Sequence, residues 1–154
     1  MEFLLFLSSI DREILELVYK ADFKVEENTP LCLLGKRYFG FLKREQKTVV
    51  LCTRNAIDIG GHSIPKLNHD EDNSMTPLYI RRALRHEAVH VAQHCNNGKT
   101  VDIVSKKKIK IHPFKEKALE KSTKVSGNRE RELEAYWMED RPKLVKSALI
   151  KYCF

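Results

Sequence analysis

The chain has 154 residues, of which 42% are hydrophobic, and it carries a net charge of +7 at pH 7. This length and composition predict one soluble globular domain spanning residues 1–154, with room for a real hydrophobic core. The short apolar run at the N-terminus contains an early acid, Glu2, and lacks a basic start and a small-residue cleavage site. We therefore expect this run to be a poor signal peptide, and it is too short to span a membrane.

The first half of the chain predicts a helix, two strands and a loop. Apolar residues recur at helical spacing from position 4 to position 21. Aromatic and β-branched residues fill 38–42 and 48–53, and the polar segment 44–47 between them predicts an antiparallel hairpin. The stretch 55–74 contains two adjacent glycines and an acidic run, so we expect a long surface loop there.

The next predicted helix carries the most informative motif of the chain. Thr76 is a suitable N-cap and Pro77 a suitable first helical residue, while 96–98, Asn-Asn-Gly, is a suitable stop. Within this helix, 86–90 has the pattern H-E-x-x-H. An apolar face lies next to the histidines and predicts a half-buried helix; it is formed by Ile80, Leu84, Ala88, Val91 and Cys95.

The chemistry of this pattern is that of a zinc site. His86 and His90 are four residues apart, so both imidazoles can reach one tetrahedral metal ion from the same helix face. Glu87 lies beside the first histidine, where a carboxylate can take a proton from a metal-bound water. A third protein ligand is needed. Asn96 stands where a metzincin would have its third histidine, which excludes that class, and His94 is rotated off the axis of the pair, as a substrate-side or structural histidine would be.

The net charge comes from one segment. Residues 99–131 contain eleven basic and four acidic residues, which gives +7, and the rest of the chain has seventeen of each. The run Lys106-Lys107-Lys108 would make a positive rim near the motif helix, suited to an acidic peptide, nucleic acid or a membrane surface. A solvated lysine-rich loop is an equal alternative. Short strands are predicted at 101–104 and 109–111, and the chain would finish with helices near 114–124, 129–140 and 143–152.

The helix over 129–140 supplies candidates for the missing ligand. The sequence H-E-x-x-H-V-x-Q over 86–93 resembles small bacterial and phage zincin domains, and E-x-E-A over 132–135 resembles the second helix of CAAX-prenyl-type and ImmA/IrrE-type peptidases. The chain is therefore similar to gluzincin peptidases, and the resemblance implies that Glu132 ligates zinc. Tyr136 stands where those families have Asp or Asn, so Glu134 remains the alternative ligand.

The resemblance implies a fold, a cofactor and a reaction. The fold would be α+β and zincin-like, dominated by helices, with a small antiparallel sheet beside the H-E-x-x-H helix and the 48–53 strand as the edge that pairs with substrate. One Zn²⁺ would serve peptide-bond hydrolysis of a peptide or protein substrate, with Glu87 as the general base. Two acids could orient an imidazole, namely Glu139 and Asp140. Four residues are candidate donors to the transition state, namely Tyr136, Tyr79, His94 and His112.

Two other functions and one question of location stay open. A non-catalytic zincin-like binding domain would keep the metal without turnover, and a basic protein would bind nucleic acid through 99–131. Four dispersed cysteines form no C-x-x-C pair. They predict buried free thiols in the reducing cytoplasm, with a disulfide pair as the less expected alternative.

Overall fold

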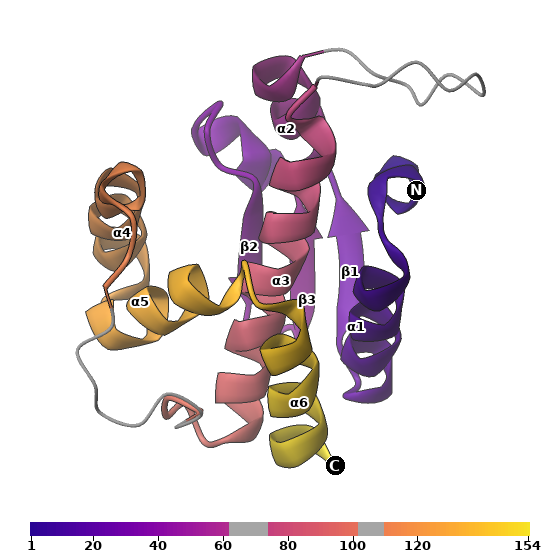
Figure 1. Ribbon diagram of the computed structural model, residues 1–154, viewed down its shortest axis with the longest axis vertical. Helices are drawn as coiled ribbons and strands as arrows, with labels where there is room; N and C mark the ends of the chain where they lie inside the picture. Colours follow the sequence, from indigo (N-terminus) through magenta and orange to yellow (C-terminus); the bar gives the residue numbers. More distant parts are fainter. Residues whose placement is uncertain (62–73, 102–109) are drawn as a thin grey trace.

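A computed structural model of the chain describes residues 1–61, 74–101 and 110–154. It is an α+β arrangement dominated by helices, with a three-stranded sheet (Figure 1). The elements in chain order are η1 (Glu2–Phe6), α1 (Ser9–Lys20), β1 (Lys24–Glu27), η2 (Pro30–Leu34), β2 (Gly40–Lys43), β3 (Thr48–Leu51), α2 (Thr53–Gly60), α3 (Thr76–Cys95), α4 (Pro113–Ser126), α5 (Arg129–Met138) and α6 (Pro142–Cys153).

The sheet is mixed, which corrects the antiparallel sheet expected from the sequence. The strand order is β1-β3-β2. The predicted hairpin of β2 and β3 is confirmed as antiparallel, but β1 adds to the other side of β3 in parallel. The sequence of β1, Lys-Val-Glu-Glu, buries only Val25, so it lacks the alternating apolar pattern that predicts a strand.

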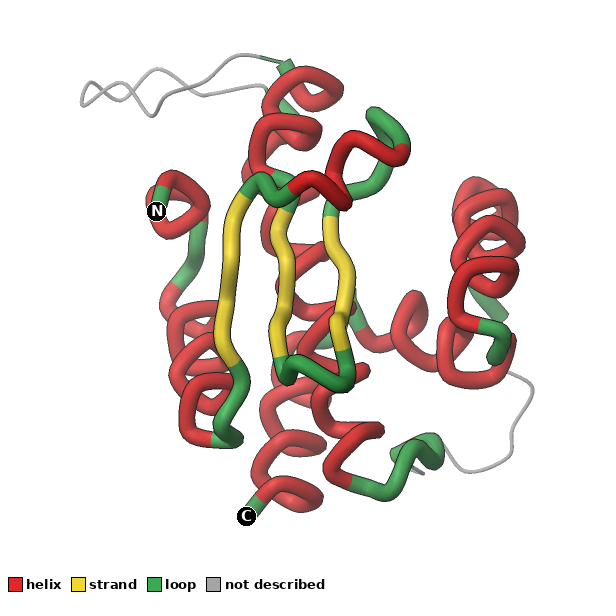
Figure 2. The backbone as a smooth tube through the Cα atoms, turned by 180° about the vertical axis from the view of Figure 1, so that it is seen from behind, coloured by secondary structure: helices red, strands yellow, loops and turns green. Residues whose placement is uncertain are grey.

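The position of β3 also corrects the expected substrate edge. All four residues of β3 are buried, and the strand is paired on both sides. Its backbone groups are therefore occupied, and an added strand cannot pair with it. The outer strands β1 and β2 carry the edges of the sheet (Figure 2).

Helix α3 runs through the middle of the molecule, behind the sheet in Figure 2. Its predicted span is confirmed, with Asn97 and Gly98 in the left-handed region that ends helices. The helix is more deeply buried than predicted, because every residue from 86 to 93 is buried. The N-cap is Met75 rather than Thr76, and the Thr76 hydroxyl instead donates to the Gly61 carbonyl at 2.8 Å, which ties α3 to α2.

The hydrophobic core surrounds α3 and joins it to its neighbours. Leu84 and Val91 of α3 pack in one cluster with Val18 of α1, Val49 of β3 and Leu149 of α6. Each of these side chains is fully buried, so each contributes about 1.5–3 kcal/mol of burial free energy. The core therefore fixes the helix that carries the H-E-x-x-H motif.

Several predicted boundaries change in the structure. A helix, α2, covers the first part of the expected loop 55–74, because Ala56 is buried in the core and Ile57 packs against it. The part of the loop that contains His62 and His69 lies outside the described residues, as do 102–104 and 109 of the strands predicted at 101–104 and 109–111. The described residues of those two predicted strands, 101, 110 and 111, are not in a strand. The N-terminal helix is broken at Ser8, where Ser8 and Asp11 form a capping box that starts α1.

The prediction of free thiols is wrong. Cys32 pairs with Cys52, and Cys95 pairs with Cys153. The first disulfide ties η2 to the end of β3, and the second ties the C-terminal end of α3 to that of α6. The paired cysteines are 20 and 58 residues apart in the sequence, so their spacing could not predict which of them pair.

Candidate metal centre

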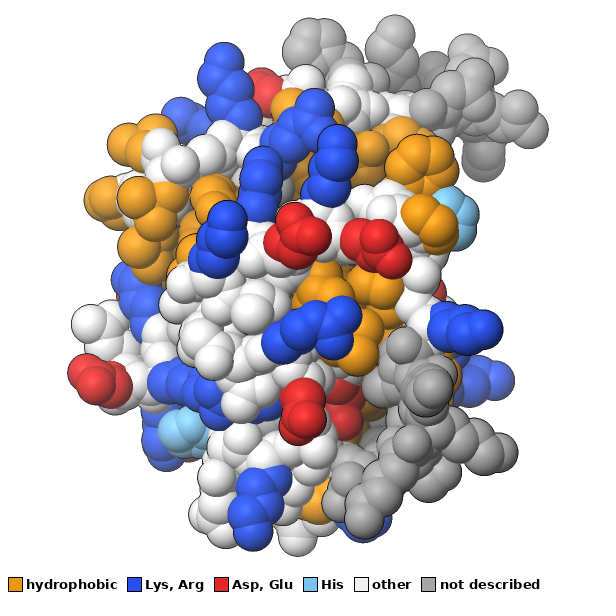
Figure 3. Space-filling view, turned by 90° about the vertical axis from the view of Figure 1, so that its left-hand side faces the viewer, with side chains coloured by type: hydrophobic (Ala, Val, Ile, Leu, Met, Phe, Trp, Pro, Cys, Tyr) orange, Lys and Arg blue, Asp and Glu red, His pale blue; other side chains and the backbone are white. Residues whose placement is uncertain are grey.

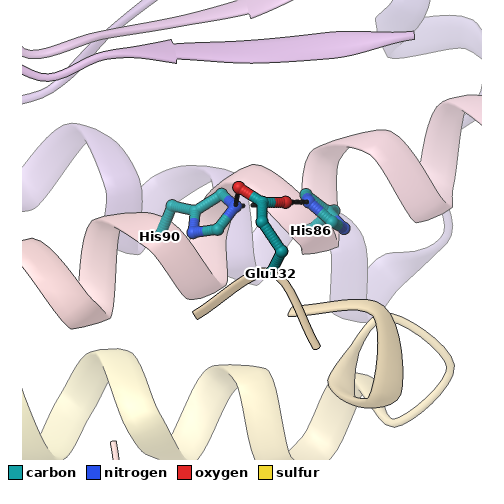
Figure 4. A group of neighbouring side chains, drawn as sticks. All are labelled: His86, His90 and Glu132. Carbon is teal, nitrogen blue, oxygen red and sulfur yellow. Dashed lines mark hydrogen bonds and ion pairs between the residues drawn. The ribbon is translucent and has the colours of Figure 1, made fainter. Parts of the chain in front are cut away.

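Three buried side chains converge between α3 and α5. His86 and His90 project from α3, and the carboxylate of Glu132 on α5 lies between them (Figure 4). Glu132 Oε2 is 3.2 Å from His86 Nε2, and Glu132 Oε1 is 3.2 Å from His90 Nε2. The two Nε2 atoms are also 3.2 Å apart. These three residues form a group that could hold a metal ion.

The spacing of these atoms fits a tetrahedral zinc site. Zinc bonds to imidazole nitrogen and carboxylate oxygen are about 2.0–2.1 Å long, which places neighbouring ligand atoms of a tetrahedron about 3.3 Å apart. The two Nε2 atoms are 3.2 Å apart, and each is 3.2 Å from a different oxygen of Glu132, so these separations are close to this value. One ligand atom from each of the three residues lies within 4.8 Å of the other two. Two imidazoles and one carboxylate are also the ligand set of several catalytic zinc sites. The residues present therefore fit the ion.

The outer nitrogens of both histidines face acceptors, which fixes where their protons lie. His86 Nδ1 is 3.1 Å from Glu139 Oε2. His90 Nδ1 is 2.7 Å from Gln93 Oε1, and the Gln93 amide nitrogen donates to the Arg131 carbonyl. When the imidazoles are neutral, as metal ligation requires, the tautomers that satisfy these contacts carry the proton on Nδ1 and point the Nε2 lone pair to the shared centre. Metal ligation needs this arrangement.

Glu134 takes a different position from Glu132. The two residues are about 200° apart around a helix, so they project to opposite sides of α5. Glu134 Oε1 accepts from Gln93 Nε2 and from the Val101 backbone nitrogen, each at 2.9 Å. Glu134 thus supports the side chain that orients His90. Of the two candidate glutamates, the structure brings only Glu132 to the histidine nitrogens.

A lysine from α4 completes the support of His86. Lys115 Nζ donates to Glu139 Oε1 at 2.7 Å and to Asp140 Oδ2 at 2.8 Å. Asp140 also pairs with Arg82 and does not reach an imidazole in the described structure, which corrects its expected role. Glu139 therefore joins α4, through Lys115, to the histidine of α3.

The buried charges of the group stabilise one another. Burial alone would raise the pKa of Glu132, but hydrogen bonds from His86 and His90 hold that pKa well below its usual range. Burial alone would lower the pKa of His86, but its bonds to Glu132 and Glu139 raise that pKa well above 6.5. Without a metal, the attraction between a protonated His86 and the negatively charged Glu132 carboxylate therefore stabilises the site.

Glu87 lies next to this group and borders the cleft. Its side chain is buried, and burial raises its carboxyl pKa more than the nearby His86 and His90 lower it. Gly40 of β2 lies so close to Glu87 that a Cβ added at Gly40 would be 3.0 Å from both Cγ and Oε1 of Glu87. A glycine at this position therefore leaves room for the carboxylate.

A cleft of about 730 Å³ opens onto the metal group between β2, α3, α4 and α5. Tyr79 and Tyr136, two of the expected transition-state donors, both line it. The Tyr79 ring stacks on Phe39, with centroids 5.0 Å apart. The Tyr136 ring meets His86 edge to face, and its hydroxyl is 2.7 Å from Ser122 Oγ on α4. Tyr136 thus has both its ring and its hydroxyl at the site.

Other predicted site residues lie elsewhere. His94 packs edge-on against Phe23 and does not line the cleft, so within the described structure it has a packing role. His112 caps α4 by accepting from the Phe114 backbone nitrogen, and it is likewise not a lining residue. The triple-lysine run 106–108 lies outside the described residues. Figure 3, seen from the side on which α4 lies, shows basic, acidic and hydrophobic side chains interspersed over that face.

The structure brings several residues to the site for which the sequence had predicted no role there. Gln93 is three residues after His90, so helical spacing could have identified it as a partner. Gly40, Arg44 and Lys115 had no such signal, because each reaches the cleft through the packing of a separate element.

No helix of the described residues is long and apolar enough to cross a membrane. Comparisons with curated proteins and with solved structures find no match. A match to a known family covers residues 3–154, which is nearly the whole chain. The chain thus belongs to the family described as a domain of unknown function, DUF8637.

Proposed function

We propose that this chain is a zinc-dependent peptidase with a zincin-like fold, in which His86, His90 and Glu132 hold one Zn²⁺. The observation that carries the proposal is the convergence of the two Nε2 atoms, 3.2 Å apart, on the Glu132 carboxylate, which has one oxygen 3.2 Å from each, beside a buried glutamate and an open cleft. These three residues would hold the ion, and its Lewis-acid chemistry would lower the pKa of a bound water molecule and polarise the scissile carbonyl.

Glu87 is the general base of the proposed reaction. Its raised pKa brings the carboxylate closer to the working pH, where it can take a proton from the attacking water and deliver that proton to the leaving amine. The burial of Glu87 keeps bulk water from competing for this proton. Of the four expected donors to the oxyanion, Tyr136 and Tyr79 line the cleft, which supports them as the candidates for this role.

The two disulfides support a second proposal, that the chain works in an oxidising compartment. Disulfides persist in secreted, periplasmic and other oxidising environments and are rare in the cytosol. The cytoplasmic location expected from the sequence depended on free thiols, and the four cysteines are paired.

The first test measures zinc per chain by elemental analysis on protein without an affinity tag. We expect about one zinc in the wild type and in Glu134→Gln, and a loss of zinc in Glu132→Gln, because only Glu132 reaches both imidazoles. Glu134→Gln is the matched control, since it is the same substitution two residues away on the same helix. A wild type without zinc, even after incubation with the ion, would contradict the proposed centre.

The second test separates a peptidase from a binding domain. Glu87→Gln should keep its zinc and lose turnover of a peptide library by about 10²- to 10⁴-fold, which is the usual contribution of a general base. A zinc-loaded wild type that cleaves no peptide would favour the non-catalytic binding domain. Full activity in Glu87→Gln would remove Glu87 as the base.

A further inference from the structure

Arg44 is a cation of the cleft that pairs with no carboxylate among the residues that the structure describes. It follows β2, in the turn that leads to β3, and its half-buried side chain lines the cleft together with Glu87 and Glu132. Its guanidinium makes no hydrogen bond or ion pair with any residue that the structure describes. A guanidinium has five N–H donors, so Arg44 has hydrogen-bonding capacity that no described residue uses, beside the group formed by His86, His90 and Glu132.

The other partly buried cations of the cleft are paired. Arg82 Nε is 2.7 Å from Asp140, and Lys115 Nζ is 2.7 Å from Glu139. Arg37 also lines the cleft without an ion pair in the described structure, but it is exposed and can be hydrated by solvent. Within the described part of the chain, Arg44 is therefore the cleft cation that is both partly buried and unpaired.

The charged residues around Arg44 do not provide its guanidinium with a paired anion in the described structure. Burial lowers its pKa, the charge of Arg131 lowers it further, and the individually weaker attractions of Glu132 and Glu87 raise it. Arginine stays charged in proteins at all ordinary pH values. The proposed function also assigns both carboxylates elsewhere, Glu132 to zinc and Glu87 to the proton. A partly desolvated charge in this setting gains most from an added anion.

We propose that Arg44 binds a carboxylate of the substrate, so that the proposed peptidase acts on peptides with a carboxylate near the scissile bond. The apolar side chains that share the cleft, Phe39 and Tyr79 among them, suit an apolar residue next to that carboxylate. The carboxylate is either the C-terminal one of the peptide or that of an acidic side chain. This inference rests on the proposed function, and the experiments below separate the two.

The first experiment measures binding to the metal-free protein, so that no metal competes for the ligand. The probes are N-acetylphenylalanine and its amide, which differ in the carboxylate, and calorimetry gives the dissociation constants. We expect the acid to bind about 10- to 100-fold more tightly than the amide, as a hydrogen-bonded ion pair provides. Arg44→Ala should abolish this preference, and Arg37→Ala should keep it. Equal binding of the two probes, or a preference that survives in Arg44→Ala, would overturn the proposal.

The second experiment identifies the source of the carboxylate with the zinc-loaded protein. Three blocked peptides are compared: a free acid, its amide, and an amide with Asp beside the scissile bond. A lower KM for the free acid alone indicates C-terminal cleavage, and a lower KM for the Asp peptide indicates an acidic side chain. Arg44→Ala should raise that KM by at least tenfold with a smaller change in kcat, and Arg44→Lys should restore part of it.

The outcomes also keep the inference apart from the proposed function. If no peptide is cleaved while the Arg44-dependent preference for the acid persists, the peptidase proposal fails and the carboxylate site stands. If peptides are cleaved equally well with and without a carboxylate, the peptidase proposal stands and the role of Arg44 is overturned.

Discussion

The two sides of α3 differ in what they bury. Toward α1 and α6 the helix buries apolar side chains such as Leu84 and Val91, and a disulfide joins its end to α6. Toward α5 and α4, on the other side in Figure 1, it buries His86 and His90 with their partner Glu132. One helix therefore provides stability on one side and a chemical site on the other. We therefore expect substitutions on the apolar side to lower stability without removing the site, and substitutions on the polar side to affect the site without unfolding the protein.

The largest expected effect comes from the apolar side. The double variant Cys95→Ser, Cys153→Ser opens a loop of 58 residues, so we expect a loss of about 4 kcal/mol in the free energy of unfolding. Chemical denaturation in the presence of a chelator measures this loss without a contribution from bound metal. Zinc stoichiometry at low temperature should stay near that of the wild type, because neither cysteine contacts the metal group.

The other disulfide provides the matched control. The variant Cys32→Ser, Cys52→Ser opens a loop of 20 residues, for which chain entropy predicts a smaller loss of about 3 kcal/mol. The order of the two losses tests whether loop size governs them. A folded Cys95→Ser, Cys153→Ser variant that had lost its zinc would contradict the separation of the two sides of α3.

On the polar side, we expect zinc affinity to rise with pH, by up to tenfold per pH unit. The raised pKa of His86 means that the metal-free site carries a proton that zinc must displace. Competition with a chelating dye between pH 5.5 and 7.5 measures this slope. In Glu139→Gln the pH range of this slope should move to lower pH, because one of the two carboxylates that bond to His86 and raise its pKa is gone. An affinity that does not change with pH would contradict this account.

The stability of the metal-free protein should follow the opposite trend. A raised histidine pKa stabilises the folded state below the ordinary value of 6.5, and that contribution is lost as the pH rises through the folded pKa of His86. The lowered pKa of Glu132 contributes above the ordinary value of 4.5 and is lost as the pH falls below it. For this group, the metal-free protein should be most stable between about pH 4.5 and 6.5.

The sequence predicted the site better than the surroundings of the site. The spacing of His86 and His90 on one helix follows from helical geometry, and the structure places both nitrogens at one centre. The choice between Glu132 and Glu134 needed the rotation of α5 against α3, which no local pattern contains. Sequence spacing could not show the cysteine pairing, because contacts over 58 residues depend on how helices pack.

The sheet shows the same limit. The hairpin of β2 and β3 was predicted because its two strands are adjacent in the sequence and rich in β-branched and aromatic residues. The parallel strand β1 is short and mostly polar, and it pairs with β3 across the whole of η2 and β2. Whether β3 lies at an edge therefore depended on this nonlocal pairing. Because β1 pairs with β3, the edge strands are β1 and β2, and the edge that lines the cleft is β2 instead of the expected β3.

The smallest expected effect tests how closely the sheet approaches the polar side of α3. In Gly40→Ala the new methyl group would lie 3.0 Å from the Glu87 carboxylate, which must move by a few tenths of an ångström. We expect turnover to fall on the order of tenfold, since small displacements of a catalytic group reduce rates steeply. Zinc content should not change, because Glu87 is not a proposed ligand. Stability should stay equal or rise slightly, since alanine loses less backbone entropy than glycine in a strand.

A double-mutant cycle with Glu87→Ala identifies the cause of that fall. Alanine lacks both the Cγ and the carboxylate that the methyl group of Gly40→Ala would meet, so this contact is absent in that background. Gly40→Ala should then have almost no further effect on the reduced turnover of Glu87→Ala, and the two changes should be strongly non-additive. Additive losses would mean that Gly40 acts through the backbone of β2 and its cleft-facing edge instead. In that case the contact between the sheet and Glu87 would not set the position of the base, and the packing of α3 alone would have to do so.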